Sequence, residues 1–367
     1  MKFTFYLPTR IISGAHCVRE HRALLKELGT RAFIMTGKQS AEKNGSLAEM
    51  TEALSAEGIE WVHFNAVTPN PSLSEVRAAA EEAKTSGTDF IVALGGGSPM
   101  DAAKAVAVLA AGEVSDQQLL SQRKFERALP LVAVPTTAGT GSEVTPYSIL
   151  TNDALQTKSF LNSEQVYPRF AFLDGRYTME LPQAITAATV VDALSHAAEG
   201  YLAVRAIPLG RTLALESLRL IGTILPALAE KRALTLEQRE TLLYASMLAG
   251  IVISQSGTTA VHAMGYSLTY FKGLDHGMAN GLLLAEYFRF IQQQRVEEIQ
   301  QIVDALGLQS INALENILET LLGKITLTAE EVERFASIAI KAGNILNTNP
   351  QPSKENLHTM LSNCFAK

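Results

Sequence analysis

The chain has 367 residues, of which 47% are hydrophobic and 19% charged; this composition excludes disordered and fibrous proteins, and the length suffices for two domains. The formal net charge is −6 without a concentrated basic run, so we expect neither nucleic acid nor a membrane surface as a partner. The sequence shows no leader-like start, no run of about 18 apolar residues and no CxxC spacing of its two cysteines. We therefore predict a soluble cytoplasmic protein without a disulfide framework or a thiolate metal site.

Short apolar runs alternate with helical segments in the first half of the chain. The runs occupy residues 31–37, 61–67, 90–96, 131–137 and 169–175. Continuous apolar strands between helices are typical of a mostly parallel sheet that is covered on both faces. Ligands of such sheets bind outside the carboxyl ends of the strands, where two glycine-rich or threonine-rich segments of this chain lie.

The stretch FIVALGGGSPMDAAKAV, residues 90–106, combines a buried strand, three glycines and the start of a helix. Ser98 suits an N-cap, Pro99 the first helical position and Asp101 the acid of a capping box, so we predict that the helix begins at about Ser98. The glycines allow unusual dihedral angles or leave room for a phosphate at the free N–H groups of the helix start. An ordinary strand-to-helix turn explains the same glycines, and the loop alone does not decide between the two.

After about Asp174 the strand pattern gives way to segments rich in Ala, Leu and Glu, whose apolar residues recur every three or four positions. These segments cover residues 183–206, 235–255, 297–323 and 328–346. The pattern predicts an all-helical second domain. We expect the boundary near residues 174–182 and assign the domains to 1–178 and 179–367.

The helical half carries an aspartate and three histidines in apolar surroundings. Asp192 and His196 are four residues apart and share a helix face. His262 lies in an apolar helical stretch, and His276 lies in a turn before the next helix. The first pair alone is better explained by a buried structural hydrogen bond, but three of the seven histidines with one aspartate favour a metal site. Such a donor set suits Fe²⁺ or Zn²⁺, which would act as a Lewis acid toward an alcohol or carbonyl oxygen.

Four motifs in order resemble the iron-containing (group III) alcohol dehydrogenase family. They are GGGSPMDAAKA (95–105), PTTAGTGSEVTP (135–146), DALSHAAEGY (192–201) and HAMGYSLTYFKGLDHGMAN (262–280). The resemblance extends from LPTRIISG near the start through most of the chain. It implies an α/β Rossmann-like N-terminal domain with a mostly parallel sheet and an all-α C-terminal domain, the dehydroquinate synthase-like superfold. It further implies a metal-dependent NAD(P) alcohol dehydrogenase or aldehyde reductase that acts on small primary alcohols or aldehydes and forms a homodimer.

The resemblance also implies roles for individual residues. The implied metal ligands are Asp192, His196, His262 and His276. The implied pyrophosphate loop comprises Gly96, Gly97, Ser98 and Asp101. Further implied cofactor contacts are Thr136, Thr137, Thr140, Thr145, Asn70 and Lys158. The threonine hydroxyls equally suit loop hydrogen bonds, Lys158 equally suits a solvated surface, and Asn280 and Phe271 either line the substrate pocket or pack.

The chain departs from the family pattern after its first full strand. Many members have an acidic residue there, which would hold the ribose hydroxyls of the adenosine. This chain has Gly37 followed by Lys38, Gln39 and Ser40. Without a carboxylate the repulsion toward a 2′-phosphate is removed, and the neighbouring donors could bind that phosphate, so we predict NADP over NAD. If Gly37 merely ends the strand, the preference stays open.

A second departure is Tyr266, one helical turn after His262, where many relatives carry a histidine beside the nicotinamide. A tyrosine relays protons through its hydroxyl but titrates near pH 10, which argues against a histidine general base here. We predict that the metal provides most of the acidification and that protons leave through water, the ribose hydroxyls or Tyr266. The predicted catalytic residues are therefore His276 and Tyr266.

Two alternatives stay open. One is a dehydroquinate synthase-like or polyol-type enzyme of the same superfold, which the apolar stretches around His262 and His276 disfavour. The other is a non-catalytic nucleotide-binding or metal-binding protein, which the intact candidate ligands and phosphate loop disfavour. The sequence does not distinguish iron from zinc.

Overall fold

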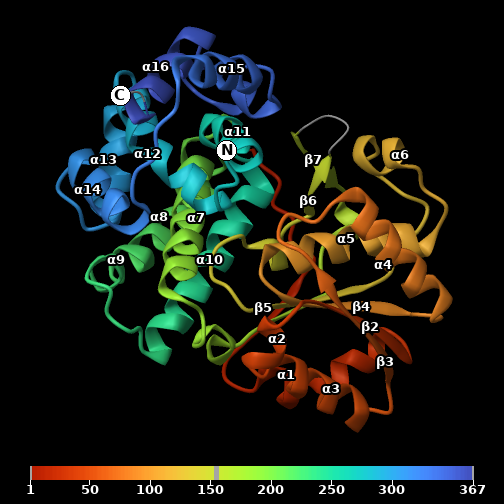
Figure 1. Cartoon of the computed structure of the whole chain (residues 1–367). Coiled ribbons are helices and arrows are strands. Elements are labelled where there is room, and N and C mark those ends of the chain that lie inside the picture. Colours follow the sequence, from red (N-terminus) through yellow and green to blue (C-terminus); the bar gives the residue numbers. More distant parts are fainter. Residues whose placement is uncertain (1, 153–156, 366–367) are drawn as a thin grey trace. The chain divides into compact units, whose positions relative to one another are not determined.

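The computed structural model describes residues 2–152 and 157–365 and separates the chain into two compact units (Figure 1). The α/β unit consists of Leu7–Thr137 and Gly141–Glu180. The helical unit consists of the chain up to Tyr6, Ala138–Thr140 and the chain from Leu181 onward. The predicted domain ranges, 1–178 and 179–367, stay a prediction beside this structural division. No described helix has both the length and the apolar character to cross a bilayer.

The described part of the α/β unit is built on a six-stranded parallel sheet in the order β1-β8-β5-β4-β2-β3. Its strands are β1 (Arg10–Ser13), β2 (Arg31–Gly37), β3 (Glu60–Val67), β4 (Phe90–Gly95), β5 (Leu131–Pro135) and β8 (Phe170–Leu173). Each of the five apolar runs predicted as strands lies in this sheet. The sequence pattern does not predict β1, nor the antiparallel pair β6 (Tyr147–Asn152) and β7 (Thr157–Asn162).

Helices cover both faces of the sheet, which is why its strands are apolar without interruption. Along β2, Phe33 and Met35 pack in one core with residues of α4 and α5, whereas Ala32 and Ile34 pack in another with residues of the helices before and after that strand. The helical elements of this unit are α1 (Cys17–Glu20), η1 (Arg22–Glu27), α2 (Ser40–Lys43), α3 (Ser46–Ala56), α4 (Leu73–Thr85), α5 (Gly97–Ala111), α6 (Asp116–Ser121), η2 (Ser142–Val144), η3 (Glu164–Val166) and η4 (Gly175–Thr178).

The strand order places the glycine-rich loop at a change of direction in the sheet. From β2 the chain first adds β3 on one side and then β4 on the other side. Because all the strands run parallel, the loops after β2, β3, β4 and β5 leave the same edge. Such a switch point is where open α/β sheets bind ligands.

Helix α5 starts one residue earlier than predicted, at Gly97, with Gly96 as the N-cap residue. The prediction that Ser98 caps this helix, with Asp101 completing a capping box, is therefore wrong. The Ser98 hydroxyl instead accepts the backbone N–H of Asn70 at 3.3 Å, and the Asp101 carboxylate has tertiary partners described below. Both side chains on which the local prediction relied, those of Ser98 and Asp101, instead bond residues that are distant in the sequence.

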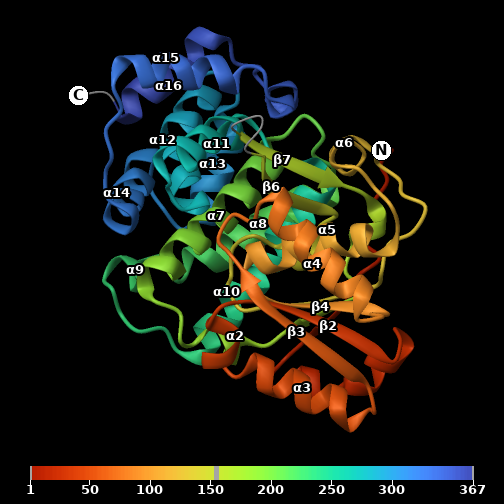
Figure 2. The same ribbon diagram turned by 45° about the vertical axis from the view of Figure 1, so that its right-hand side comes forward.

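The helical unit, in its described residues, contains helices and their connections. Its elements are α7 (Gln183–Leu202), α8 (Pro208–Gly222), α9 (Leu225–Ala229), α10 (Leu236–Ser256), α11 (Ala260–Lys272), α12 (His276–Gln292), α13 (Val296–Ala305), α14 (Ile311–Leu322), α15 (Ala329–Ala339), η5 (Gly343–Asn347) and α16 (Lys354–Phe365). Helix α7 is buried along most of its length and packs against α8, α10, α12 and α14 (Figure 2).

Two glycines let α12 approach α7 closely. A Cβ added at Gly277 would lie 1.9 Å from the backbone oxygen of Ala188, and one added at Gly281 would lie 2.3 Å from Cγ1 of Val191. A side chain at either position would overlap α7, with its backbone at Gly277 and with the Val191 side chain at Gly281. This close approach brings the start of α12 next to the middle of α7.

Candidate functional site

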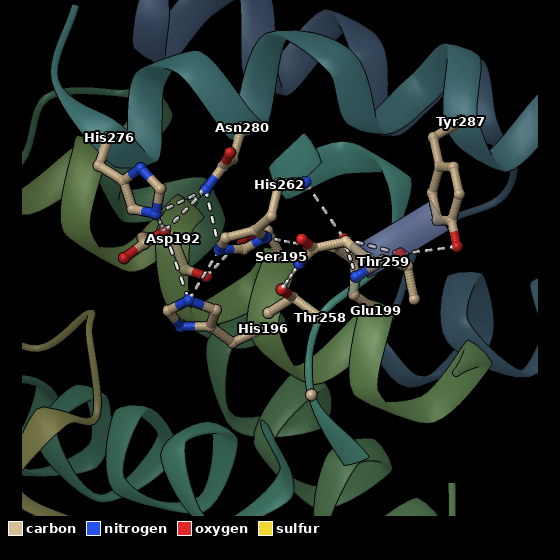
Figure 3. Close-up of polar contacts among 12 residues, drawn as sticks. Asp192, Ser195, His196, Glu199, Thr258, Thr259, His262, His276, Asn280 and Tyr287 are labelled. Atoms are coloured by element: carbon tan, nitrogen blue, oxygen red, sulfur yellow. Dashed lines mark hydrogen bonds and ion pairs between the residues drawn. The ribbon is translucent and has the colours of Figure 1, made fainter. Parts of the chain in front are cut away.

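The four predicted ligand residues converge inside the helical unit (Figure 3). Asp192 and His196 lie one turn apart on α7, His262 lies on α11, and His276 is the first residue of α12. One ligand atom from each side chain lies within 4.8 Å of the other three. Three helices from separate parts of the sequence thus supply one compact group of donors.

The distances in this group suit a bound cation. The Nε2 atoms of His196 and His262 are 3.0 Å apart, and Oδ1 of Asp192 lies 3.8 Å from His196 Nε2 and 3.9 Å from His276 Nε2. Two donor atoms that each lie about 2.1 Å from one ion are at most about 4.2 Å apart. The three separations quoted meet this limit, and a donor set of one carboxylate and three imidazoles suits a divalent ion of intermediate hardness, such as Fe²⁺ or Zn²⁺.

The site is closed on one side and open on the other. The side chains of Asp192, His196 and His262 are 3%, 6% and 3% exposed, whereas that of His276 is 33% exposed. Among the four side chains, only that of His276 is substantially exposed.

Two of the imidazoles are oriented by contacts at their far nitrogens. Nδ1 of His196 lies 3.3 Å from the carbonyl oxygen of Gly139, and Nδ1 of His262 is hydrogen-bonded to the Glu199 carboxylate. An acceptor at Nδ1 holds the proton there and leaves the Nε2 lone pair directed at the site. Gly139 has no room for a side chain, since a Cβ would lie 2.6 Å from that of Thr189.

Asn280 is a further member of the cluster. Its amide nitrogen lies 3.2 Å from each of three donor atoms, Oδ1 of Asp192, Nε2 of His262 and Nε2 of His276. The residue is fully buried, and its amide oxygen has no hydrogen-bond partner among the described residues. The sequence identifies Asn280 only as pocket-lining or packing, and its spacing of four residues from His276 is the one local signal for this role.

Burial and charge set the protonation of these groups. Burial alone would raise the pKa of Asp192, but the three histidines and the Asn280 amide hold that pKa below its ordinary value. Burial lowers the pKa of His196. Burial also opposes the charged form of His262, yet the Glu199 carboxylate raises the pKa of that imidazole. Asp192 is thus favoured as the anion and His196 as the neutral imidazole, the forms that bind a cation.

Tyr266 lies beside the open side of the cluster. Its ring stacks on that of His276, with centroids 5.9 Å apart and an angle of 13° between the planes. It also meets the His262 ring edge to face at 6.2 Å. The structure therefore places Tyr266 against two candidate ligands, and its catalytic role stays a prediction.

Most of the predicted cofactor residues lie along one edge of the parallel sheet. Gly37 is the last residue of β2, Lys38 follows it and Ser40 begins α2, and the last two are exposed. Gly96 and Thr137 face each other, because a Cβ at Gly96 would lie 3.0 Å from the Thr137 hydroxyl oxygen. A side chain at Gly96, the N-cap residue of α5, would therefore crowd Thr137.

Three predicted residues distant in sequence meet at this edge. The Lys158 ammonium donates to the side-chain oxygen of Asn70 at 2.6 Å, and the Asn70 N–H reaches the Ser98 hydroxyl. Asn70 has a φ of 59°, a left-handed conformation that asparagine tolerates better than most residues. Burial lowers the pKa of Lys158 to about 8. Lys158 is therefore held in place by this contact, unlike a freely solvated surface lysine.

Asp101 and Thr145 belong to an internal network around Lys104, a residue that the sequence does not single out. The Lys104 side chain is fully buried and donates to the hydroxyls of Ser142 at 2.6 Å and Thr145 at 3.1 Å. Asp101 accepts from the Ser142 hydroxyl at 2.7 Å and from the backbone N–H of Ile149 at 3.0 Å.

The remaining predicted threonines divide between the two units. Thr136 is buried, and its N–H donates to the carbonyl oxygen of Gly95 at 2.9 Å. Thr140 belongs to the helical unit, with Ala138 and Gly139. Cofactor contacts at all of these positions stay predictions.

Comparison with known proteins agrees with this arrangement. The family model "Iron-containing alcohol dehydrogenase" matches residues 8–175, and the model "Fe-containing alcohol dehydrogenase family, C-terminal" matches residues 186–365. The chain is 31% identical to the probable alcohol dehydrogenase EutG of Escherichia coli (strain K12) over 360 residues, 95% of this chain and 91% of that protein.

Solved structures of the same fold include an iron-containing alcohol dehydrogenase from Thermotoga maritima, with a TM-score of 0.93, 37% identity and 100% coverage of both chains. A sulfoacetaldehyde reductase from Bifidobacterium kashiwanohense in complex with NAD⁺ gives a TM-score of 0.88 at 30% identity, covering 100% of this chain and 99% of that chain. The predicted fold class is confirmed: a parallel-sheet α/β domain followed by a helical domain. The chain belongs to the iron-containing alcohol dehydrogenase family.

Proposed function

We propose that this chain is a metal-dependent NAD(P) alcohol dehydrogenase that interconverts small primary alcohols and aldehydes. The observation that carries the proposal is the buried convergence of Asp192, His196, His262 and His276 in a chain of this family. A divalent ion bound by these four groups supplies a Lewis acid toward an alcohol or carbonyl oxygen. A nicotinamide dinucleotide supplies the hydride acceptor or donor.

The chain's own residues orient the reactants and handle the proton. Gly139 and Glu199 fix the imidazoles of His196 and His262, so that their Nε2 atoms stay directed at the donor group. The exposed side of His276 admits the substrate. Tyr266, stacked on His276, is the side chain best placed to pass the alcohol proton toward water.

The direct test of this function is turnover after controlled metal loading. Protein stripped of metal is loaded with Fe²⁺ or Zn²⁺ and assayed on a panel of small aldehydes with NADPH and NADH. We expect stoichiometric oxidation of the nucleotide that depends on the metal and is lost in His276→Ala. His358→Ala removes a partly exposed histidine outside the cluster and serves as the matched control. Nucleotide binding without turnover would favour the non-catalytic alternative, and turnover without net nucleotide oxidation would favour the dehydroquinate synthase-like one.

NADP is the proposed cofactor in preference to NAD. The end of β2 and the start of α2 present Gly37 and the exposed Lys38 and Ser40 where many members have a carboxylate, so they offer donors rather than repulsion to a 2′-phosphate. Gly37 has room for a side chain, because the nearest atoms to an added Cβ are 3.7 Å and 3.8 Å away. Gly37→Asp should therefore fold and should lower the ratio of kcat/KM for NADPH to that for NADH by about tenfold or more. An unchanged ratio contradicts this assignment. The family resemblance further supports a cytoplasmic homodimer. Light scattering, which measures the molar mass in solution, tests the oligomeric state.

A further inference from the structure

Helix α11 begins against a carboxylate from another helix. Its N-cap residue, Thr259, makes no side-chain capping bond within α11. Instead, Oε1 of Glu199 on α7 accepts the backbone N–H of Thr259 at 2.8 Å, the Thr259 hydroxyl at 2.7 Å and the backbone N–H of His262 at 3.3 Å (Figure 3). An anion at a helix N-terminus satisfies free N–H groups and meets the positive end of the helix dipole. Glu199 therefore fixes the start of the helix that carries His262.

The second oxygen of the same carboxylate holds the imidazole itself. Oε2 of Glu199 accepts a hydrogen bond from Nδ1 of His262. Nε2 of that ring then faces the donor group, 3.0 Å from Nε2 of His196 and 3.2 Å from the amide nitrogen of Asn280. One carboxylate thus fixes both the backbone position of His262 and the nitrogen that it presents to the site.

The surroundings of Glu199 hold it rigidly. Glu199, Thr259 and Tyr287 are all 0% exposed, and the hydroxyl oxygens of Thr259 and Tyr287 are 2.9 Å apart in a hydrogen bond. A buried carboxylate is costly unless it is hydrogen-bonded and its charge is offset. The hydrogen bonds are present, and a divalent ion on the neighbouring cluster would offset the two negative charges of Asp192 and Glu199.

We infer that Glu199 is a positioning residue for the metal centre, which sets the orientation and the tautomer of His262 so that its Nε2 binds the ion. The inference rests on the proposed function for the presence of the ion, and it assigns a role to a residue that does not touch that ion. Carboxylates that hold a ligating histidine in this way typically contribute about 10- to 100-fold in metal affinity.

Glu199→Gln tests the tautomer directly, because glutamine has the same shape. If the amide oxygen keeps the three donors at the start of α11, the NH₂ group faces Nδ1 of His262. Nδ1 must then accept a hydrogen bond from the NH₂ group, so the imidazole proton moves to Nε2. A protonated Nε2 has no lone pair with which to bind the ion. We expect the affinity of the stripped full-length protein for Zn²⁺, measured by chelator competition at fixed pH, to fall by about tenfold or more.

Thr259→Val is the matched control, since it removes the hydroxyl that bonds Oε1 of Glu199 and Tyr287 but leaves the contact between Oε2 and His262. We expect this variant to lose thermal stability without metal and to bind Zn²⁺ within about threefold of the wild type, because the tautomer is unchanged. In the zinc-loaded wild type, long-range ¹H–¹⁵N correlation spectra of the histidine rings should show His262 protonated at Nδ1, a readout that needs no variant.

The outcomes separate the two proposals. Wild-type affinity in Glu199→Gln, or a His262 ring protonated at Nε2 in the zinc-loaded protein, overturns the role of Glu199 and leaves the proposed function intact. A wild-type protein that binds no divalent ion in the cluster overturns the proposed function, and the role of Glu199 with it.

Discussion

We expect Gly277→Ala to perturb the proposed metal centre through the backbone without changing a single donor. The Cβ of the new alanine would lie 1.9 Å from the carbonyl oxygen of Ala188, 2.8 Å from its carbonyl carbon and 2.9 Å from Cβ of Asp192. The obstacle is mainly the α7 backbone, which cannot rotate away as a flexible side chain could. The start of α12 must therefore move away from α7 and carry His276 with it.

The size of the displacement follows from these contacts. A Cβ atom in a protein hardly ever lies within 3.0 Å of a non-bonded heavy atom. The contact of 1.9 Å with the Ala188 oxygen therefore requires the start of α12 to move by about 1 Å. Overpacking of this kind costs about 1–3 kcal/mol of folding free energy. Metal donors tolerate errors of only about 0.2 Å, so a shift of this size should also remove His276 as an effective ligand.

Two measurements check this prediction: denaturant unfolding of the metal-free protein and Zn²⁺ affinity by chelator competition. Both stability and affinity should fall in Gly277→Ala. Gly343→Ala is the control, since an added Cβ there has nothing within 4 Å among the described residues and the position has no left-handed φ. A Gly277→Ala protein with wild-type stability and wild-type affinity would refute the claim that close helix packing sets the geometry of the donors.

Two further changes test single side chains. Glu143 is 1% exposed, its Oε1 has no hydrogen-bond partner among the described residues, and burial raises its pKa from 4.5 to about 7. Between pH 4.5 and about pH 7 the folded protein therefore keeps Glu143 protonated while the unfolded chain has lost that proton. As the pH rises through this range, the free energy of unfolding falls by up to about 3 kcal/mol. Glu143→Gln should remove that loss, so its stability relative to the wild type should increase from pH 5 to pH 8, and a constant difference would argue against it. Tyr266→Phe keeps the ring stacked on His276 and removes the hydroxyl, so the pH profile of kcat/KM should change while Zn²⁺ affinity does not; an unaltered profile removes Tyr266 from the proton relay.

The parallel sheet could be predicted from sequence because its strands are buried on both faces and are therefore apolar throughout. The elements that the pattern misses lack this signature. Strand β1 has four residues, none of them buried. Strand β6 alternates in burial, but two of its three buried residues are Ser148 and Asn152, so hydrophobicity does not record the alternation. The pairing of β1 with the distant strand β8 is a tertiary property, whereas β6 pairs with its sequence neighbour β7.

The four proposed donor residues, which the structure brings together, could be singled out because aspartate and histidine are uncommon in apolar helices, whereas the residues that support them carry no such signal. Glu199 follows Asp192 and His196 at the seventh and third positions, on the same face of α7. A glutamate on a helix is usually solvated, so the spacing alone does not indicate a supporting role for Glu199. That role becomes visible only in its contacts with the start of α11. Ser98 and Asp101 show the opposite error, in which a convincing local motif is used for tertiary contacts instead.

One face of α7 thus has to supply side chains to the proposed metal site and, at the same time, pack closely against another helix. It supplies Asp192, His196 and Glu199, and it must also lie close enough to α12 for His276 to join the same donor group. Side chains large enough to fill an ordinary helix interface would hold those helices too far apart. The glycines of α12 that face α7 are therefore as necessary to the site as the histidines, although they contribute no donor atom. A sequence search for this type of centre should look for glycine directly after the last histidine and again four residues later.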